Sequence, residues 1–363
     1  MTTKRPIHQM IRSVNYGDAI SNHTVELMKL LRKWGHPSEI YVEACDPRMA
    51  GFCRPYQTYP DDPDDVLIYQ YGAGSLLTDF LHSRLQRTVL HYHNITPPRF
   101  FGTTDRGLAT VLRRGREGLY QMCDRVRGAV AGTEYNRQEL RDMGFADVEP
   151  VPYLLILSDL EKSADSPAGR RIAERFNDGY VNILFVSRVV PNKKQEDLIQ
   201  ALAYYQKVID PQARLLLAGS WTNCRYKVAL EMLADHLGIG ADLHFSGHLT
   251  MEGGFAGYYK AGSVFVCLSE HEGFGVPLIE SMYFDLPIIA YASSAVPETL
   301  GGCGFLLTEK RYDVIGELIY NLVTDRALRQ QVVRKQRERL AAFDRATVQS
   351  QIKSWVESLA HDV

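Results

Sequence analysis

The chain has 363 residues, of which 45% are hydrophobic, and a formal net charge of -2 at pH 7. This length is enough for two globular domains of ordinary size, each with its own core. Because the charge shows no basic excess, nucleic acid is not the expected partner. No stretch resembles a secretory signal or a membrane span, which predicts a cytosolic protein. The six cysteines occur without a CxxC pair and are expected to be isolated thiols.

In the first half of the chain, short β-rich segments alternate with helical ones, which is typical of a parallel sheet covered by helices. Strands are expected at Ile7–Arg12, Glu39–Ala44, Val66–Tyr71, Val89–His93, Gly128–Gly132 and Val148–Pro152. Helices are expected at Ala19–Trp34, Ser75–Leu81, Gly107–Asp124 and Tyr135–Met143. The pattern predicts an α/β domain.

The second half repeats the same alternation. Strands are expected at Val181–Val189, Arg214–Ala218, Leu243–Ser246, Val264–Leu268 and Ile288–Tyr291. Helices are expected at Gln195–Val208, Tyr226–Leu237, Gly254–Lys260 and Pro277–Tyr283. Between the halves, Ser158–Gly179 is rich in charge, Ser, Gly and Pro, as interdomain linkers tend to be. We therefore expect two similar α/β domains with their boundary in this stretch.

The last part of the chain contains helical patterns only. Its final helix is expected at Thr347–Leu359, where Ile352, Val356 and Leu359 recur at helical spacing around Trp355. An apolar stripe of this kind predicts that the helix packs against a core.

A loop that follows an expected strand carries the strongest functional signal. It runs from Ser269 to Val276, at the carboxyl end of a parallel strand, where open α/β sheets bind ligands. Its glycines let the backbone approach a ligand closely, and Pro277 suits the first turn of a helix whose amino end holds a phosphate. Glu272 precedes this helix and Glu280 lies one turn inside it, so the two carboxylates bracket one elongated ligand.

The segment His271–Glu280 resembles the Glu-x7-Glu motif of glycosyltransferase family 4, whose members are retaining enzymes with the GT-B fold. The resemblance implies two facing Rossmann-like domains with doubly wound parallel sheets, residues 1–157 for the acceptor and 158–344 for the nucleotide sugar. It also implies that residues 345–363 form a helix that returns to the N-terminal domain.

The same resemblance assigns roles within the loop. Glu272 is expected to contact the hydroxyls of the donor sugar, and Glu280 to bind the ribose. The backbone amides expected to line the sugar and the phosphates belong to Gly273, Phe274, Gly275 and Val276.

Basic residues follow the first expected strand of the second half. Arg188 and Lys193 lie five residues apart around the βα turn, and their charges suit the oxygens of a departing diphosphate. Family 4 has Arg and Lys at this turn. Ser187 stands where that family usually has Gly, and Lys194 where Gly is common, so the sequence leaves open which lysine binds the donor.

Two histidines end the expected strand Val89–His93. His93 resembles the cleft histidine that family 4 places near the donor sugar. The alternative is a strand-end histidine that bonds only to the backbone. His91, two positions earlier, is expected to pack within the sheet.

The first expected strand leads into a loop that contains Gly17 and Asp18. We assign Gly17 to donor binding, although family 4 usually has two adjacent glycines at this position. A role of Asp18 as a helix N-cap is an equal alternative. The single glycine also argues against a dinucleotide fingerprint.

Further segments resemble family 4, namely Ala131–Leu140, Ala218-Gly219, Phe245–Gly247 and Val296–Glu298. Gly219 and Gly247 follow expected strands and are assigned, with Lys194, to donor binding. The resemblance is denser in the second half, as expected if the first half binds a variable acceptor.

Two patterns are less specific. Asp62-Pro-Asp64 is similar to the DxD motif of metal-dependent transferases, but it precedes a strand instead of following one, and no metal is expected. The helix expected at Gly107–Asp124 has a basic face, with Arg106, Arg113, Arg114, Arg116, Arg125 and Arg127 in or near it. This face is either an ordinary solvated surface or a contact with anionic lipid at the inner face of the plasma membrane.

We therefore expect a retaining hexosyltransferase with a front-face mechanism and no cofactor. Its expected catalytic residues are Glu272, His93, Arg188 and Lys193. The resemblance favours GDP-mannose, or else a UDP-sugar, as the donor. A glycan or lipid-linked glycan in the assembly of bacterial surface polysaccharide, such as lipopolysaccharide, is the expected acceptor. The alternatives are a sugar-nucleotide epimerase or a phosphorylase on the same fold, and a non-catalytic sugar-nucleotide-binding protein.

Overall fold

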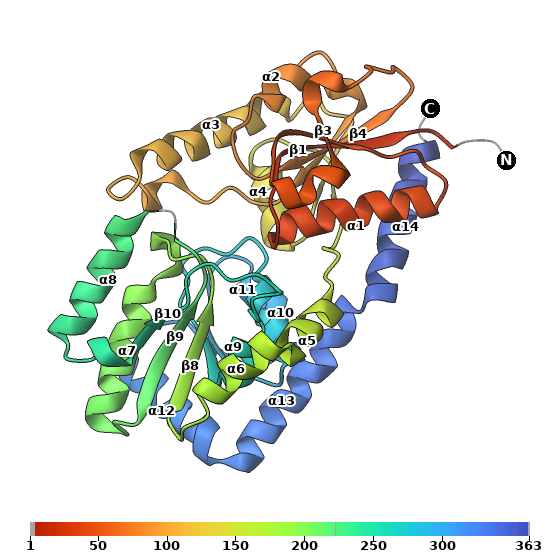
Figure 1. The fold of residues 1–363 in the computed structure, drawn as a ribbon. Helices are drawn as coiled ribbons and strands as arrows, with labels where there is room; N and C mark the ends of the chain where they lie inside the picture. The colour runs from red at the N-terminus through yellow and green to blue at the C-terminus, as the bar shows by residue number, and fades with distance from the viewer. Residues whose placement is uncertain (1–3, 222, 362–363) are drawn as a thin grey trace. The chain divides into compact units, whose positions relative to one another are not determined.

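The computed structural model describes residues 4–221 and 223–361. The chain divides into two compact units. The first contains the described residues up to Gly102, Arg106–Leu155 and those from Phe343 onward, and the second contains Thr103–Asp105 and Ile156–Ala342. Each unit has a parallel sheet with helices between its strands (Figure 1), so the predicted α/β fold is confirmed.

The first unit is built on a seven-stranded parallel sheet with the order β3-β2-β1-β4-β5-β6-β7. Its strands are β1 (Ile7–Val14), β2 (Ile40–Cys45), β3 (Cys53–Pro55), β4 (Val66–Tyr71), β5 (Thr88–Tyr92), β6 (Gly128–Ala131) and β7 (Val148–Pro150). Its helices include α1 (Ala19–Lys33), α2 (Leu77–Leu81), α3 (Arg106–Met122) and α4 (Glu134–Asp142). Every residue of the central strand β4 is buried, as expected for a parallel strand with both faces covered.

The second unit is built on a six-stranded parallel sheet with the order β10-β9-β8-β11-β12-β13. Its strands are β8 (Val181–Val186), β9 (Ala213–Ala218), β10 (Leu243–Phe245), β11 (Val264–Cys267), β12 (Ile288–Tyr291) and β13 (Phe305–Leu307). Its helices are α5 (Leu157–Asp165), α6 (Pro167–Arg175), α7 (Gln195–Val208), α8 (Cys224–His236), α9 (Gly257–Ala261), α10 (Val276–Tyr283), α11 (Val296–Leu300), α12 (Tyr312–Thr324) and α13 (Arg326–Leu340).

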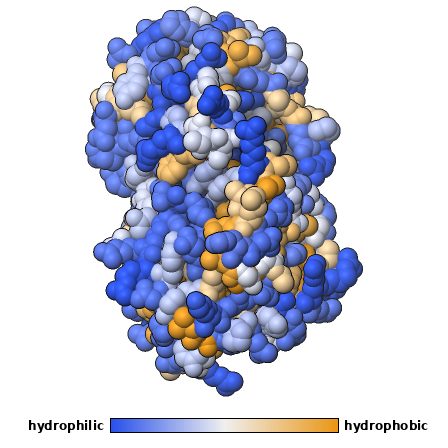
Figure 2. Space-filling view, turned by 90° about the vertical axis from the view of Figure 1, so that its left-hand side faces the viewer, coloured by the Kyte–Doolittle hydropathy of each residue, from blue (hydrophilic) through white to orange (hydrophobic). Residues whose placement is uncertain are grey.

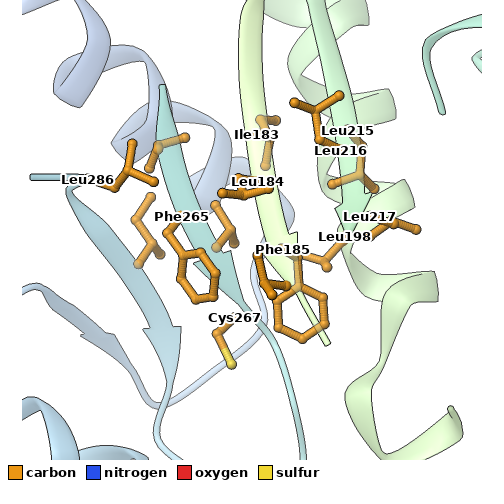
Figure 3. Packing of buried hydrophobic residues seen from close by; sticks show 14 of the residues in the cluster. Ile183, Leu184, Phe185, Leu198, Leu215, Leu216, Leu217, Phe265, Cys267 and Leu286 are labelled. Carbon is orange, nitrogen blue, oxygen red and sulfur yellow. The ribbon is translucent and has the colours of Figure 1, made fainter. Parts of the chain in front are cut away.

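The core of the second unit surrounds its two central strands. All residues of β8 and β11 are buried, and the rings of Phe185 and Phe265 lie 6.0 Å apart between centroids. Figure 3 shows these side chains with Leu184 and the leucines of β9. Such a core holds the carboxyl ends of β8 and β11 in place, and the loops that are expected to bind the donor begin there.

The helix α14 (Arg345–His361) completes the first unit at the end of the chain. Ile352, Trp355 and Val356 are at most 4% exposed, and they pack in one cluster with residues of α1 and of the first sheet. Arg127 also donates to the carbonyl of Leu359, over 2.7 Å. The expectation that the last helix returns to the N-terminal part is therefore confirmed (Figure 1).

The stretch Ser158–Gly179, expected to be a linker, forms most of α5 and α6 instead. Ser166 caps α6 by accepting a hydrogen bond from the amide of Gly169, over 3.0 Å, and Pro167 occupies the first turn. The Ser, Pro and charge content that indicated a linker thus reflects a helix cap and two exposed helical faces.

Several boundaries differ from the prediction at the ends of elements. The strand expected to include His93 ends at Tyr92, and the strand expected to reach Val189 ends at Val186. The short elements β3, α11 and β13 were missed, because segments of three to five residues give too little periodicity to be recognised.

The surface carries apolar residues in separate patches among hydrophilic ones, as Figure 2 shows for one face. The most exposed large apolar residues are Met232, Leu76 and Tyr120, at 67%, 63% and 60%. Scattered exposed residues of this kind are normal. No helix in the described part of the chain is long and apolar enough to cross a bilayer.

Candidate functional site

The loop between β11 and α10 is shaped by a left-handed glycine. Gly275 has φ +85° and precedes α10, and a Cβ at this position would lie 2.9 Å from Leu278 Cδ1. A glycine adopts this conformation without steric cost. Pro277 then occupies the first turn of α10, as predicted. No described side chain caps α10, and a helix amino end of this kind can bind an anion.

Hydrogen bonds tie this loop to the turn after β8. The amide of Glu270 donates to the carbonyl of Asn192 over 2.9 Å, and Asn192 Nδ2 donates to the carbonyl of His271 over 3.1 Å. Asn192 is only 3% exposed. The sequence prediction missed this asparagine, whose side chain joins the two segments that were assigned to the donor.

The turn after β8 also supplies a cation to the loop. Lys193 Nζ lies 2.6 Å from Glu272 Oε2, and both side chains are mostly buried, at 16% and 10% exposed. The amide of Glu272 is held by Ser294 Oγ over 3.3 Å, and its carbonyl accepts from the amide of Ala295 over 3.2 Å. The structure therefore brings together two of the predicted catalytic residues.

Lys194 points to different carboxylates. Its Nζ lies 3.2 Å from Glu196 Oε1 and 3.6 Å from Glu270 Oε1. Its backbone is left-handed, with φ 54° and ψ 45°, immediately before α7. Glycine reaches this conformation more easily than lysine.

A third lysine, Lys310, also contacts the loop. Lys310 Nζ lies 2.6 Å from Asp197 Oδ2 and 3.1 Å from Glu270 Oε1, and Tyr312 donates to Asp197 over 2.9 Å. These contacts connect α7 and α12 with the residue that precedes His271. Nothing in the spacing of Lys310 along the chain indicated this position.

Arg188 is placed differently from Lys193. Its side chain is exposed, and its guanidinium makes no hydrogen bond or ion pair with any described residue. Its carbonyl accepts from Gln195 Nε2 over 3.0 Å, which anchors the backbone of the turn. The backbone of Arg188 is thus anchored, while its guanidinium contacts no described residue through a hydrogen bond or ion pair.

Glu280 lies in α10, and Tyr259 of α9 donates a hydrogen bond to its Oε2. Burial raises the pKa of Glu280 to about 7, and the hydrogen bond from Tyr259 opposes this rise. Tyr259 was not among the predicted site residues, because α9 carries no motif in the sequence.

Gly219 and Gly247 form an isolated antiparallel bridge beyond the ends of β9 and β10. A Cβ on Gly219 would lie 2.0 Å from the carbonyl oxygen of Ser187. A Cβ on Gly247 would only contact the ring of Trp221, at 3.6 Å. Close backbone packing therefore accounts for the glycine at 219.

His93 belongs to a buried cluster in the first unit. Its Nδ1 lies 2.8 Å from the Tyr153 hydroxyl and its Nε2 lies 2.5 Å from Gln70 Oε1. Burial lowers the pKa of His93 well below its usual value, with a smaller contribution from His23, so the ring is neutral. The imidazole of His93 is bonded to side chains, whereas the alternative expected bonds only to the backbone. His91 is fully buried in β5, within the sheet as predicted.

The loop of Gly17 precedes α1. Asp18 caps this helix, because its Oδ2 accepts from the amide of Ser21 over 2.9 Å and from its hydroxyl over 2.8 Å. The N-cap interpretation of Asp18 is confirmed. Gly17 has φ +79° and open space around its Cα.

The residues of the two less specific patterns, Asp62-Pro-Asp64 and the arginines near α3, mostly bond to other residues of the first unit. Asp62 Oδ1 accepts from the amide of Asp64 over 2.9 Å, which makes this segment a local turn. Among the arginines near α3, Arg116 pairs with Glu139 over 2.7 Å and Arg125 donates to the carbonyl of His82 over 3.0 Å. Arg127 is also engaged, as described for α14. The arginines on the exposed face of α3 are Arg106, Arg113 and Arg114.

Comparison with known proteins finds that part of this chain is similar to a known family. Residues 170–339 match the family described as glycosyl transferases group 1. Over 198 residues the chain is 26% identical to a GDP-mannose-dependent alpha-(1-6)-phosphatidylinositol monomannoside mannosyltransferase of Mycobacterium tuberculosis, a match that covers 50% of this chain and 49% of that protein. The chain therefore spans about half the length of that relative.

Two matches cover most of the chain at lower identity. The O-antigen chain mannosyltransferase B of Escherichia coli is 22% identical over 330 residues, which are 89% of this chain and 81% of that protein. Sucrose-phosphate synthase from Thermosynechococcus elongatus has the same fold, with a TM-score of 0.75 and 18% identity over 98% of this chain and 99% of that one. The region that matches the glycosyl transferases group 1, residues 170–339, contains the Lys193–Glu272 pair and the loop before α10.

Proposed function

We propose that this chain is a retaining glycosyltransferase that moves a hexose from a nucleotide-diphosphate sugar to a glycan or lipid-linked glycan. The single observation that supports this best is the contact of Lys193 with Glu272, just before the amino end of α10, which no described side chain caps. It combines a cation, a carboxylate and a set of amides in one place. A sugar diphosphate requires these three kinds of group.

The roles follow from charge and position. Glu272 accepts hydrogen bonds from the sugar hydroxyls, and the amides of Gly273 to Val276 bind the sugar and the phosphates. Lys193 and Arg188 neutralise the charge that grows on the leaving diphosphate. Lys193 is preferred to Lys194 because its ammonium already lies on Glu272, whereas Lys194 is directed to Glu196 and Glu270. The ribose is bound by Glu280.

The acceptor hydroxyl attacks from the face that the diphosphate leaves, and the anomeric configuration is kept. The transition state resembles an oxocarbenium ion, so its main requirement is a stabilised leaving group. Arg188 and Lys193 supply the positive charge that a metal ion supplies in other transferases. His93 is assigned to the sugar end of the donor. Because both its ring nitrogens are bonded within the first unit, its role would be to hold that surface in shape.

GDP-mannose is the proposed donor. The mycobacterial relative is named as GDP-mannose-dependent, and the Escherichia coli relative is an O-antigen chain mannosyltransferase, which supports a mannose-like sugar and an acceptor in surface-polysaccharide assembly. A UDP-sugar is the second candidate.

The test is a thermal-shift screen of the purified chain with GDP, UDP and ADP and their sugars, followed by product analysis. A ligand at one hundred times its Kd stabilises the folded state by about 2.7 kcal/mol. A glycoside with the anomeric configuration of the donor is expected. An epimerised sugar nucleotide, a strict requirement for free phosphate, or binding without turnover would each replace this proposal with one of its alternatives.

We also propose that α3 contacts an anionic membrane surface. Arg106, Arg113 and Arg114 are exposed there, and Tyr120 on the same helix is 60% exposed. Co-sedimentation with phosphatidylglycerol vesicles should exceed that with phosphatidylcholine vesicles. The double substitution Arg113→Ala and Arg114→Ala should remove most of this difference, and equal binding to both vesicles would refute the contact.

A further inference from the structure

The carboxylate of Glu280 is held on one side only. Tyr259, which is 0% exposed, donates to Oε2 of this side chain. In the described part of the chain, no hydrogen-bond donor reaches Oε1. Burial raises the pKa of Tyr259 well above its usual value, so the phenol remains a donor at neutral pH. The pair therefore leaves one carboxylate oxygen for a ligand.

The ring of Tyr259 is clamped by other aromatic rings. It stacks on Phe284, with 5.3 Å between centroids and an interplanar angle of 7°, and Phe255 meets it edge-on at 6.1 Å and 84°. Phe284 follows directly on α10, the helix that carries Glu280. The hydroxyl is consequently presented to Glu280 from a fixed direction.

The helix α9 is itself held by α5 and α6. A Cβ on Gly257 would lie 2.4 Å from the carbonyl oxygen of Gly169 in α6, so the two backbones touch. Ser163 of α5 donates to the carbonyl of Met251 over 2.6 Å, just before α9. The segment that was expected to be a linker thus packs against α9, the helix that carries Tyr259.

We propose that Tyr259 is a positioning residue for the donor: it occupies Glu280 Oε2 and so holds the carboxylate with Oε1 available to the ribose hydroxyls. This inference rests on the proposed function, in which Glu280 binds the ribose.

The hydrogen bond also controls the charge of Glu280. Burial raises the pKa of this carboxyl to about 7, and the phenol of Tyr259 lowers it by stabilising the ionised form. The charged groups on the neighbouring elements bond to other residues. Glu161 of α5 accepts a hydrogen bond from Tyr283, and Lys260 of α9 pairs with Asp165. On α13, Arg337 pairs with Asp285, and Arg339 donates to the carbonyls of Thr299 and Glu298 at α11. Tyr259 is therefore the main polar influence on Glu280.

The sign of the pH dependence follows. The ionised carboxylate is an acceptor at both oxygens, whereas the protonated form carries an O–H donor on one of them, so donor affinity rises with pH through about 7. Removing the phenol raises the pKa of Glu280 further, which moves this transition to higher pH.

The experiment measures the Kd for GDP, or for UDP or ADP if the screen selects one of these, between pH 6 and 9 for wild type and Tyr259→Phe. The variant should bind about tenfold more weakly at pH 7, since a hydrogen bond to a charged group is lost. The deficit should shrink at pH 9, because Glu280 is then ionised in both proteins. The matched control is Tyr258→Phe, which removes the neighbouring hydroxyl that lies 2.8 Å from His244 Nε2, and it should leave affinity and pH profile unchanged.

Two further variants make the result decisive. In a Glu280→Gln background, Tyr259→Phe should have little additional effect on affinity, because the two groups act as one unit. Phe284→Leu, which unstacks the ring but keeps the phenol, should produce a smaller loss of affinity and a smaller displacement of the pH profile in the same alkaline direction. It serves as the test if Tyr259→Phe does not fold. The inference is overturned if Tyr259→Phe and Phe284→Leu both bind with the affinity and the pH profile of the wild type. Failure of the wild-type chain to bind any of the three diphosphates would overturn the proposed function, and the inference with it.

Discussion

At the scale of single residues, the proposed site depends on cations placed around a diphosphate. Lys193 and Arg188 follow the same strand, but Lys193 is paired with Glu272 while the guanidinium of Arg188 is unengaged by the described residues. Because the Arg188 side chain is exposed and breaks no contact with a described residue, turning it toward a phosphate costs little free energy. Its planar guanidinium can bond two oxygens at once.

Replacing this arginine tests the diphosphate clamp. Arg188→Ala should lower turnover from the nucleotide sugar by roughly 10²- to 10³-fold, because charge stabilisation of the leaving group is lost. Because the side chain is exposed, the melting temperature should stay close to that of wild type. Steady-state kinetics measure the effect, and near-normal transfer would remove Arg188 from the clamp.

The two adjacent lysines are separated by a paired comparison. Lys193→Ala removes the partner of a mostly buried Glu272 and should reduce kcat/KM by roughly 10²-fold or more. Lys194→Gly removes a side chain from a position with φ 54°, where glycine is favoured, and should retain most activity. The opposite order of the two effects would show that Lys194 binds the donor.

At the scale of elements, the ends of β8 and β9 are held together by direct backbone contact. Gly219→Ala should destabilise the folded state by about 1–3 kcal/mol, since its Cβ would lie 2.0 Å from the carbonyl oxygen of Ser187. Urea denaturation measures this loss. Gly51→Ala, at a glycine with open space and an ordinary backbone, is the control and should change stability by much less.

The helix α14 gives the second prediction at this scale. Trp355 is 4% exposed in the first unit. Trp355→Ala should lower the free energy of unfolding by about 3–5 kcal/mol. Ser354→Ala, at the exposed neighbouring position, should be nearly neutral. Equal stabilities of the two variants in thermal or urea denaturation would contradict the packing of α14 on the first unit.

At the scale of the whole molecule, the proposed chemistry relies on fixed protein charges. Transfer from the nucleotide sugar should therefore continue at an unchanged rate after treatment with EDTA, because Arg188 and Lys193 balance the leaving diphosphate. Initial rates with and without added Mg²⁺ or Mn²⁺ measure this. A loss of activity that either ion restores would mean that a metal shares the role of these side chains.

Much of the architecture was available from the sequence alone. The alternation of strands and helices predicted two α/β sheets, because hydrophobic periodicity is a local property that needs no knowledge of distant contacts. The glycines and Pro277 likewise indicated a loop before a helix amino end, since glycine permits a left-handed backbone and proline fixes its own φ at a value that suits the first turn.

Only the tertiary structure decided which groups meet. Lys193 and Glu272 are 79 residues apart, and their contact depends on two neighbouring parallel strands that end at the same edge of a sheet. Tyr259 belongs to no sequence motif, so its hydrogen bond to Glu280 could not be predicted. The charge-rich stretch 158–179 resembled a linker, but its helices pack against α9. The sequence by itself determined the class of fold and the glycosyltransferase motif, because these are written in local spacing. The choice between Lys193 and Lys194 and the support of Glu280 depend on side-chain packing across distant segments, which local spacing does not encode.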